Sequence, residues 1–330
     1  MAQVDDELVD WAGIRQNYDG HGLLIGNGAS MAVWERFSYP SLFAEAPLTE
    51  LDKSIFDALD TTNFELVLDS LRISEIVCSA VGHDRSGVHE RYLSIRRSLF
   101  NAVRSVHVRW DRVPREAFEE IEQELHRYGT VFSTNYDLLA YWSIMCRETE
   151  RIRDFFWNPD LAFDATNTQL TGTASTILYL HGGIHLYVDT RTGATMKRKS
   201  EGGGLLGFGD MAHSTRRPLF ISEGRSSDKL RSIRSSDYLS FAYQTLADYS
   251  DPLVIFGHSL GETDAHIAQA IKSSAKRRIA IGLHPGRSMA IIKAKTHLED
   301  VLDGQLIEYF DASTHPLGYP GMRIPPHAGP

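Results

Sequence analysis

Short runs of apolar, often β-branched residues recur along the chain, and polar or helical stretches separate them. Such runs indicate buried strands, and strands that alternate with helices are typical of an α/β fold with a parallel sheet. We expect strands at residues 22–25, 130–133, 177–180, 218–221, 253–256, 278–282, 290–293 and 306–310. Ligands of open α/β sheets bind outside the carboxyl ends of the strands. The polar loops that follow these runs are therefore the first candidates for a site.

The stretches between the strands differ in character. Residues 41–128 place apolar side chains at helical spacing, which predicts an α-helical insertion or cap on the sheet. Residues 188–217 are rich in glycine, arginine, threonine and lysine and lack apolar periodicity, so we expect a flexible loop there. Residues 315–330 are rich in proline and predict an extended C-terminal tail. No internal repeat is visible.

Composition excludes several classes of protein. The chain has 330 residues, 42% of them hydrophobic, which is enough for a sizeable core. It contains no membrane-length apolar segment, and its acidic start does not resemble a signal peptide, so we expect a cytoplasmic protein. Its two cysteines, Cys78 and Cys146, are too few for a four-thiolate zinc site, and we expect no disulfide and no metal. The net charge of −9 gives no strong signal for nucleic-acid binding.

Polar loops follow the first two expected strands. Gly26-Asn-Gly-Ala-Ser30 can bring backbone amides and a helix start close to a phosphate, because glycine allows a close approach. It lacks the third glycine of the usual dinucleotide fingerprint, so a simple tight turn explains it equally well. In Ser133-Thr-Asn-Tyr-Asp137, Ser133 or Asn135 fits a helix cap and Asp137 fits the first helical turn. Neither loop decides the function alone.

A histidine and a serine follow two later strands. His181 comes directly after the run at 177–180, where it can act as a general base or serve as a hydrogen-bonded structural residue. Ser259 lies in Gly257-His-Ser-Leu-Gly261, directly after the run at 253–256. This Gly-x-Ser-x-Gly pattern is typical of the nucleophile elbow of a serine esterase with the α/β-hydrolase fold. The esterase interpretation has a weakness, because the chain after Ser259 is short for the remaining strands, acid and histidine of that fold.

Taken in order, the motifs resemble those of the sirtuin family, in particular the bacterial sirtuin-like proteins of antiphage defence. Gly26-Asn-Gly-Ala-Ser30 is similar to the family's Gly-Ala-Gly-x-Ser loop, and Ser133-Thr-Asn-Tyr-Asp137 is similar to its Thr-Gln-Asn-x-Asp segment. His181-Gly182 resembles its catalytic His-Gly. Pro218–Gly224 and Gly257-His-Ser-Leu260 resemble its Pro-x-Val-x-Phe-Gly-Glu and Gly-Thr-Ser-Leu segments. The resemblance implies one sirtuin-like catalytic domain over the whole chain, with a Rossmann-like NAD-binding fold.

The departures from the family narrow the expected activity. Protein-deacylating sirtuins carry a zinc ribbon with four cysteines after the catalytic histidine, whereas no cysteine follows His181 here. Trp34, Arg36, Phe37 and Tyr39 stand where deacylases have characteristic acidic and arginine residues. The resemblance therefore implies not a deacylase but an NAD⁺ hydrolase (NADase), which cleaves NAD to nicotinamide and ADP-ribose. In antiphage defence, such an enzyme causes abortive infection by depleting NAD.

The resemblance also implies roles for individual residues. Asn135 would position the attacking water and contact the ribose, Asp137 would organise the loop near the nicotinamide, and His181 would accept a proton. Asn63 could reach the pocket from the helical region, although it also fits a helix cap. The residues expected to bind NAD are Gly26, Asn27, Gly28, Ser30, Ser133, Thr134, Gly257 and Ser259.

Two further points concern partners and turnover. Sirtuin-like defence enzymes are usually silent until they assemble or are released by a partner. We therefore expect a homo-oligomer, an ATPase or helicase, or an Argonaute-like protein as partner. An alternative to catalysis is a sensor that binds NAD or ADP-ribose without turnover and regulates another protein. Retention of both Asn135 and His181 favours catalysis, because a binder would not need both.

Overall fold

The central strands are buried on both faces, which is why they are continuous apolar runs without polar alternation. The computed structural model describes residues 4–146, 151–166, 174–198, 215–221 and 225–325. In it, a seven-stranded parallel sheet has the order β10-β9-β8-β1-β2-β4-β3. This confirms the predicted α/β fold with a Rossmann-like parallel sheet. The strands are β1 (Gly22–Ile25), β2 (Thr130–Ser133), β3 (Ile152–Arg153), β4 (Ser175–Tyr179), β8 (Leu253–Phe256), β9 (Arg278–Leu283) and β10 (Leu306–Asp311).

Strand β1 lies at the point where the chain reverses its direction of travel across the sheet. It pairs with β2 on one side and with β8 on the other, so that Leu24 is opposite both Phe132 and Ile255. The carboxyl ends of β8, β1, β2 and β4 are therefore neighbours. Such a switch point in an open α/β sheet opens a crevice in which ligands bind.

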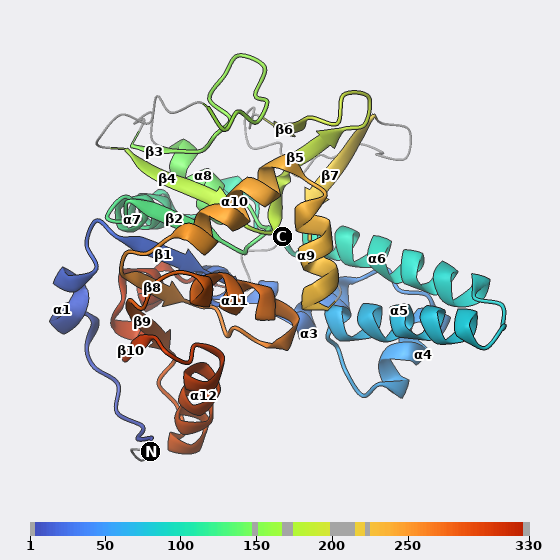
Figure 1. The fold of residues 1–330 in the computed structure, drawn as a ribbon, viewed down its shortest axis with the longest axis horizontal. Coiled ribbons are helices and arrows are strands. Elements are labelled where there is room, and N and C mark those ends of the chain that lie inside the picture. The colour runs from blue at the N-terminus through green and yellow to red at the C-terminus, as the bar shows by residue number, and fades with distance from the viewer. Residues whose placement is uncertain (1–3, 147–150, 167–173, 199–214, 222–224, 326–330) are drawn as a thin grey trace.

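Helices pack around this sheet, and Figure 1 shows α10 and α11 crossing in front of it. The expected strand at 290–293 is wrong, because these residues lie inside helix α12 (Ser288–Val301). Ile291 and Leu298 are its buried apolar residues, and a run this short does not distinguish a strand from a buried helical turn. The helices of this part are α1 (Trp11–Ile14), α2 (Asn27–Val33), α7 (Arg115–Leu125), α8 (Leu139–Cys146), α9 (Ser226–Arg234), α10 (Asp237–Asp248) and α11 (Ala265–Ser273).

The region from 41 to 128 is occupied largely by helices, of which α5 and α6 form a long pair projecting to one side of the sheet in Figure 1. Phe56 and Phe64 are fully buried within it. Asn63 caps α5, since its Oδ1 accepts hydrogen bonds from the backbone N–H groups of Glu65 and Leu66. Besides α7, the helices of this part are α3 (Tyr39–Glu45), α4 (Glu50–Ala58), α5 (Phe64–Ala80) and α6 (Ser86–Val106).

A second, antiparallel sheet follows His181 and has the order β6-β5-β7. Its strands are β5 (Gly182–Asp189), β6 (Thr195–Lys197) and β7 (Arg216–Phe220). The expected flexible loop at 188–217 is therefore corrected in part, because strands take up both of its ends and residues 195–197; residues 199–214 lie outside the described part. Strand β6 was not predicted because its sequence is polar. Its Lys197 is buried, and the Nζ atom donates to both carboxylate oxygens of Asp154 at 2.9 Å.

The C-terminal residues differ from the extended tail that the prolines suggested. Residues 312–322 form three short 3₁₀ turns, Ala312–Thr314, Pro316–Gly318 and Pro320–Met322. Leu317, Met322 and Ile324 are buried, and the Ile324 N–H donates to the carbonyl of Val33 at 2.8 Å. Residues 326–330 lie outside the described part. Within the described ranges, no helix has the length and apolar character needed to cross a membrane. Among the described residues, neither Cys78 nor Cys146 forms a disulfide.

Candidate active site

The glycines of the loops after β1 and β8 allow these two loops to pack directly on each other. The Gly28 N–H donates to the Gly257 carbonyl at 2.8 Å. Gly257 has φ +69°, and a Cβ added to Gly28 would lie only 2.7 Å from the Gly257 Cα. Backbone contact therefore explains these glycines, and the Gly28 amide is already taken in this structure. Gly26 is equally enclosed, since a Cβ there would lie 2.6 Å from the Gly257 carbonyl oxygen.

The loop after β2 forms a buried hydrogen-bond chain with Ser30. Asn135 Nδ2 donates to Ser30 Oγ at 2.8 Å, and Ser30 Oγ donates to Asp137 Oδ2 at 2.5 Å. The other oxygen of Asp137 accepts the Leu139 N–H at the start of α8. Because Ser30 has one hydroxyl proton and gives it to Asp137, it can only accept from Asn135, and this fixes the orientation of the amide. Asn135 Oδ1 is left buried without a hydrogen-bond partner in the described residues.

A buried polar atom without a partner costs free energy, so Asn135 Oδ1 indicates a place where a ligand or water donates a hydrogen bond. Asn135 borders a cavity of about 270 Å³ at the carboxyl edge of the sheet. Of the residues predicted from the sequence, Asn27, Gly28, Thr134, Asn135, Asp137, His181, Gly257 and Ser259 line it. Gly26, Ser30 and Ser133 lie behind the wall and support it: the Ser133 hydroxyl, for example, accepts the Asn135 N–H at 3.2 Å.

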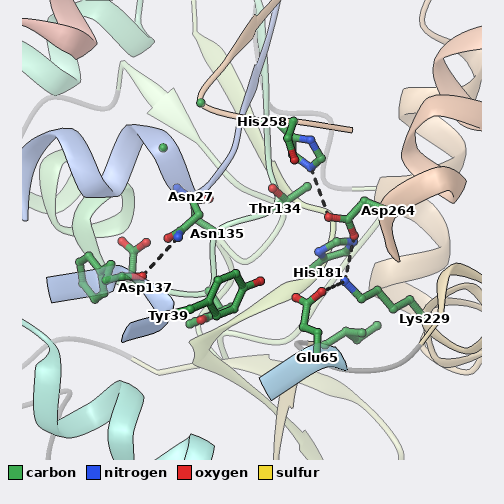
Figure 2. A pocket seen from close by; sticks show the side chains of 16 residues that line it. Asn27, Tyr39, Glu65, Thr134, Asn135, Asp137, His181, Lys229, His258 and Asp264 are labelled. Carbon is green, nitrogen blue, oxygen red and sulfur yellow. Dashed lines mark hydrogen bonds and ion pairs between the residues drawn. The ribbon is translucent and has the colours of Figure 1, made fainter. Parts of the chain in front are cut away.

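His181 lies across the cavity from Asn135 (Figure 2), and a second histidine, His266, contacts its ring. Its Nε2 lies 2.9 Å from Nε2 of His266 and 3.9 Å from Oδ1 of Asp264. Among the described residues, its other ring nitrogen, Nδ1, has no hydrogen-bond partner. Burial lowers the pKa of His181 well below its ordinary value, although Asp264 acts in the opposite direction. The ring is therefore neutral and able to take a proton.

Lys229 occupies the same wall, between two carboxylates (Figure 2). Its Nζ donates to Asp264 Oδ1 at 2.9 Å and to Glu65 Oε2 at 3.3 Å, and its side chain is only 1% exposed. Burial opposes the charge of Lys229, but the two carboxylates raise its pKa above the ordinary value. Burial also tends to raise the pKa of Asp264, yet His181, Lys229 and His258 outweigh it and lower that pKa. For Glu65 burial prevails, and its pKa is raised.

A divalent cation would compete with Lys229 for this place. His181, Asp264 and His266 offer ligand atoms that lie within 4.8 Å of one another. However, a metal ion bound to Asp264 would stand next to the Lys229 ammonium, and the two positive charges would repel each other strongly at low exposure. The Lys229 ammonium is therefore the counter-ion of the Asp264 carboxylate in this structure.

The Ser259 loop lacks the geometry of a nucleophile elbow. An elbow places the serine itself on a strained turn directly between strand and helix. Here the residues with positive φ are Gly257, at 69°, and Leu260, at 49°, rather than Ser259, and α11 begins only at Ala265. No hydrogen bond joins Ser259 Oγ to a histidine of the described residues. These findings disfavour the serine-esterase interpretation.

Several cavity residues were not predicted from the sequence. Asp264 and His258 flank the predicted Ser259, and Lys229 comes from helix α9. Glu65 lies two residues from Asn63, so the sequence pointed to the correct segment but to the capping residue instead of the cavity residue. A polar Glu-Thr-Asp-Ala-His stretch directly after the glycine-containing loop was a usable signal for Asp264. The full set of unpredicted lining residues is Phe37, Tyr39, Glu65, Tyr136, Ile221, Lys229, His258 and Asp264. Residues 222–224 of the Pro218–Gly224 motif lie outside the described part.

Fold and site define an α/β protein with a polar cavity at the switch point of a parallel sheet. The chain belongs to the family described as domain of unknown function DUF4917, whose model matches residues 23–317. Among curated proteins, none matches this chain.

Solved structures of Sir2 proteins resemble the chain at a low level. A structure from work on the mechanism and regulation of Sir2 enzymes is 14% identical, with coverage of 94% of this chain and 93% of that chain and a TM-score of 0.35. A Sir2 mutant with a p53 peptide and NAD is 13% identical, with coverage of 93% and 92% and the same TM-score of 0.35. A mutant Sir2 homologue with ADP-ribose is 12% identical, with coverage of 90% and 100% and a TM-score of 0.31. Similarity at this level carries no information about the activity of the chain.

Proposed function

We propose that this protein binds NAD in the cavity at the switch point and hydrolyses the bond between nicotinamide and ribose. The observation that carries the proposal is a pair of unsatisfied polar atoms on residues of one cavity. Within the described part of the chain, Asn135 Oδ1 is a buried acceptor without a partner, and His181 Nδ1 is a ring nitrogen without one. A general base and a fixed acceptor on opposite sides of a cavity are what activation of a bound water requires.

The chemistry follows from these two groups. The electron pair of the carbon–nitrogen bond leaves with nicotinamide, and the anomeric carbon passes through an oxocarbenium-like state. The oxygen of a water molecule then bonds to this carbon while one proton of the water passes to His181. Asn135 Oδ1 accepts a hydrogen bond from the water or from a ribose hydroxyl, and this fixes its direction of attack. Asp137 holds Asn135 through Ser30.

The remaining parts of NAD would lie toward the β1 and β8 loops. Because the Gly28 amide is occupied, the exposed side chains of Asn27 and Ser259 are the better phosphate contacts, with Thr134 and Gly257 beside them. The cavity of about 270 Å³ is slightly smaller than the roughly 300–1,000 Å³ typical of ligand pockets. It therefore suits the reacting nicotinamide riboside half, and the adenosine half would extend beyond it.

The resemblance to sirtuin-like defence proteins supports a biological role as well. In this proposal the enzyme is a cytoplasmic antiphage effector that depletes NAD when a homo-oligomer forms or when an ATPase, helicase or Argonaute-like partner releases it. The test is nicotinamide release from NAD by wild type, Asn135→Ala, His181→Ala and Ser259→Ala. We expect loss of turnover in the first two variants and partial activity in the third. Ester hydrolysis that depends on Ser259 would contradict the proposal. Binding of ADP-ribose without any NAD turnover, even at high protein concentration, would favour the alternative that the protein is a sensor.

A further inference from the structure

A second buried histidine stands directly behind His181. His266 belongs to α11 and is 1% exposed, and its Nε2 lies 2.9 Å from Nε2 of His181. It does not line the cavity itself. Because a buried ring nitrogen without a partner costs free energy, the hydrogen bonds of His266 determine which of its nitrogens carries the proton.

These hydrogen bonds connect His266 to a serine. Ser226 Oγ accepts the backbone N–H of His266 at 2.7 Å and lies 3.1 Å from the ring Nδ1 of His266. When both rings are neutral, a single proton lies between the two Nε2 atoms, and two arrangements are possible. In one, His181 Nε2–H donates to His266, whose Nδ1–H donates to Ser226. In the other, Ser226 donates to His266 Nδ1, and His266 Nε2–H donates to His181.

The charges around the pair favour the first arrangement. Asp264 Oδ1 lies 3.9 Å from His181 Nε2, and its negative charge stabilises a proton bound to this nearby nitrogen. The other charged or titratable groups near the pair include Lys229 from α9, which is bonded to Asp264 and Glu65, and His258 after β8, whose Nε2 lies 3.8 Å from Asp264 Oδ2. The Tyr243 hydroxyl of α10 donates to the backbone carbonyl of His266. His258 Nδ1 accepts the Leu260 N–H, so the neutral ring carries its proton on Nε2 and also donates toward Asp264.

We propose that His266 and Ser226 are positioning residues that hold His181 in the tautomer with the proton on Nε2 and the lone pair on Nδ1. In this tautomer the basic nitrogen is Nδ1, which has no hydrogen-bond partner among the described residues, and it can take a proton in the cavity. When it does, the imidazolium keeps its Nε2–H bond to His266 and lies next to the Asp264 carboxylate. Burial lowers the pKa of His266 to about 4, so that His266 stays neutral and remains an acceptor near pH 7.

The effect of His266 on the reaction rate rests on the proposed NAD hydrolysis, whereas the tautomer of His181 can be measured whether or not the protein hydrolyses NAD. The decisive variants are His266→Gln, which retains an acceptor near the position of Nε2, and His266→Leu, which removes it. We expect His266→Leu to lower kcat for nicotinamide release by roughly 10- to 100-fold with KM changed less than about twofold, because a general base contributes about 10²–10⁴ in rate. His266→Gln should recover most of this loss. Equal losses in both variants at an unchanged Tm would overturn the proposal.

A measurement that needs no turnover separates this inference from the proposed function. In ¹⁵N-histidine-labelled wild-type protein at pH 7.5, two-bond ¹H–¹⁵N spectra report which ring nitrogen carries the proton, and the His181→Asn variant assigns the signals. We expect His181 as the Nε2–H tautomer and His266 as the Nδ1–H tautomer. His181 with its proton on Nδ1 would overturn the inference even if the enzyme is active, and so would stoichiometric Zn²⁺ that is lost in His266→Leu. The expected tautomers in a protein without NAD turnover would leave the inference standing and refute only the NADase.

Discussion

Replacing Lys229 with methionine tests the electrostatics of the cavity wall. The substitution keeps much of the apolar stem but removes the ammonium that bonds Asp264 at 2.9 Å and Glu65 at 3.3 Å. The side chains of Lys229, Glu65 and Asp264 are only 1%, 15% and 21% exposed. Removing one partner from a buried ion pair costs about 3–5 kcal/mol, because the remaining charge is left uncompensated. We therefore expect a loss of about 3 kcal/mol and a Tm lower by roughly 6 °C at pH 8.

The loss should depend on pH with a definite sign. In the wild type the pKa of Asp264 is lowered, so this group contributes stability above its unfolded-state pKa of about 3.9 and loses it as the pH falls. Without Lys229 that contribution disappears, so the difference in the free energy of unfolding between the two proteins should stay level from pH 8 to about pH 5 and shrink as the pH falls further toward about pH 2. Thermal and urea unfolding across this range measure it.

A matched control is Lys53→Met. Lys53 pairs with Glu50 at 3.0 Å, but its side chain is 47% exposed and that of Glu50 is 91% exposed. Exposed pairs of this kind contribute little, so we expect Tm to change by less than about 1 °C. A wild-type Tm for Lys229→Met at pH 8 would refute the reasoning, as would a difference that grows when the pH is lowered.

Three further predictions concern the base, a glycine and a cap. Because burial lowers the pKa of His181, kcat/KM for nicotinamide release should stay level as the pH falls from 8 through 6.5; a fall centred near 6.5 in the pH profile would contradict this. Gly257→Ala should destabilise the protein more than Gly193→Ala in urea unfolding. Both glycines have positive φ, at a cost of about 1 kcal/mol each, but only at Gly257 would a Cβ meet a backbone atom, at 2.3 Å; equal losses would refute the close packing. Asn63→Ala should lower stability by about 1 kcal/mol and leave NAD turnover intact, and a selective loss of turnover would place this side chain in the reaction.

The sequence could predict the parallel sheet because its central strands are buried on both faces and therefore appear as uninterrupted apolar runs. The residues after β1, β2, β4 and β8 could be predicted as neighbours for the same reason, since parallel strands bring their carboxyl ends to one edge. The antiparallel sheet was harder to see. Strand β5 starts with two glycines, and β6 carries a buried Lys197 whose partner, Asp154, is distant in sequence.

The charged wall of the cavity could not be predicted from local patterns. Lys229 stands in a polar helical segment in which nothing distinguishes it from an exposed lysine. Its burial depends on Glu65 and Asp264, which come from segments far away along the chain. The contact between His181 and His266 likewise joins residues that are 85 positions apart. Such sites depend on contacts between residues that are distant in sequence, and the periodicity of apolar residues gives no information about these contacts.

The central claim is that Asn135 and His181 act on the nicotinamide–ribose bond of NAD. Its most direct test is the rate of nicotinamide release at saturating NAD by wild type and by Asn135→Ala, with ADP-ribose affinity measured on both by calorimetry. The account predicts release by the wild type, a fall of about 10²-fold or more in kcat for Asn135→Ala, and ADP-ribose affinities within a few-fold of each other. Undiminished release by Asn135→Ala, or no release by the wild type at any concentration, would contradict it.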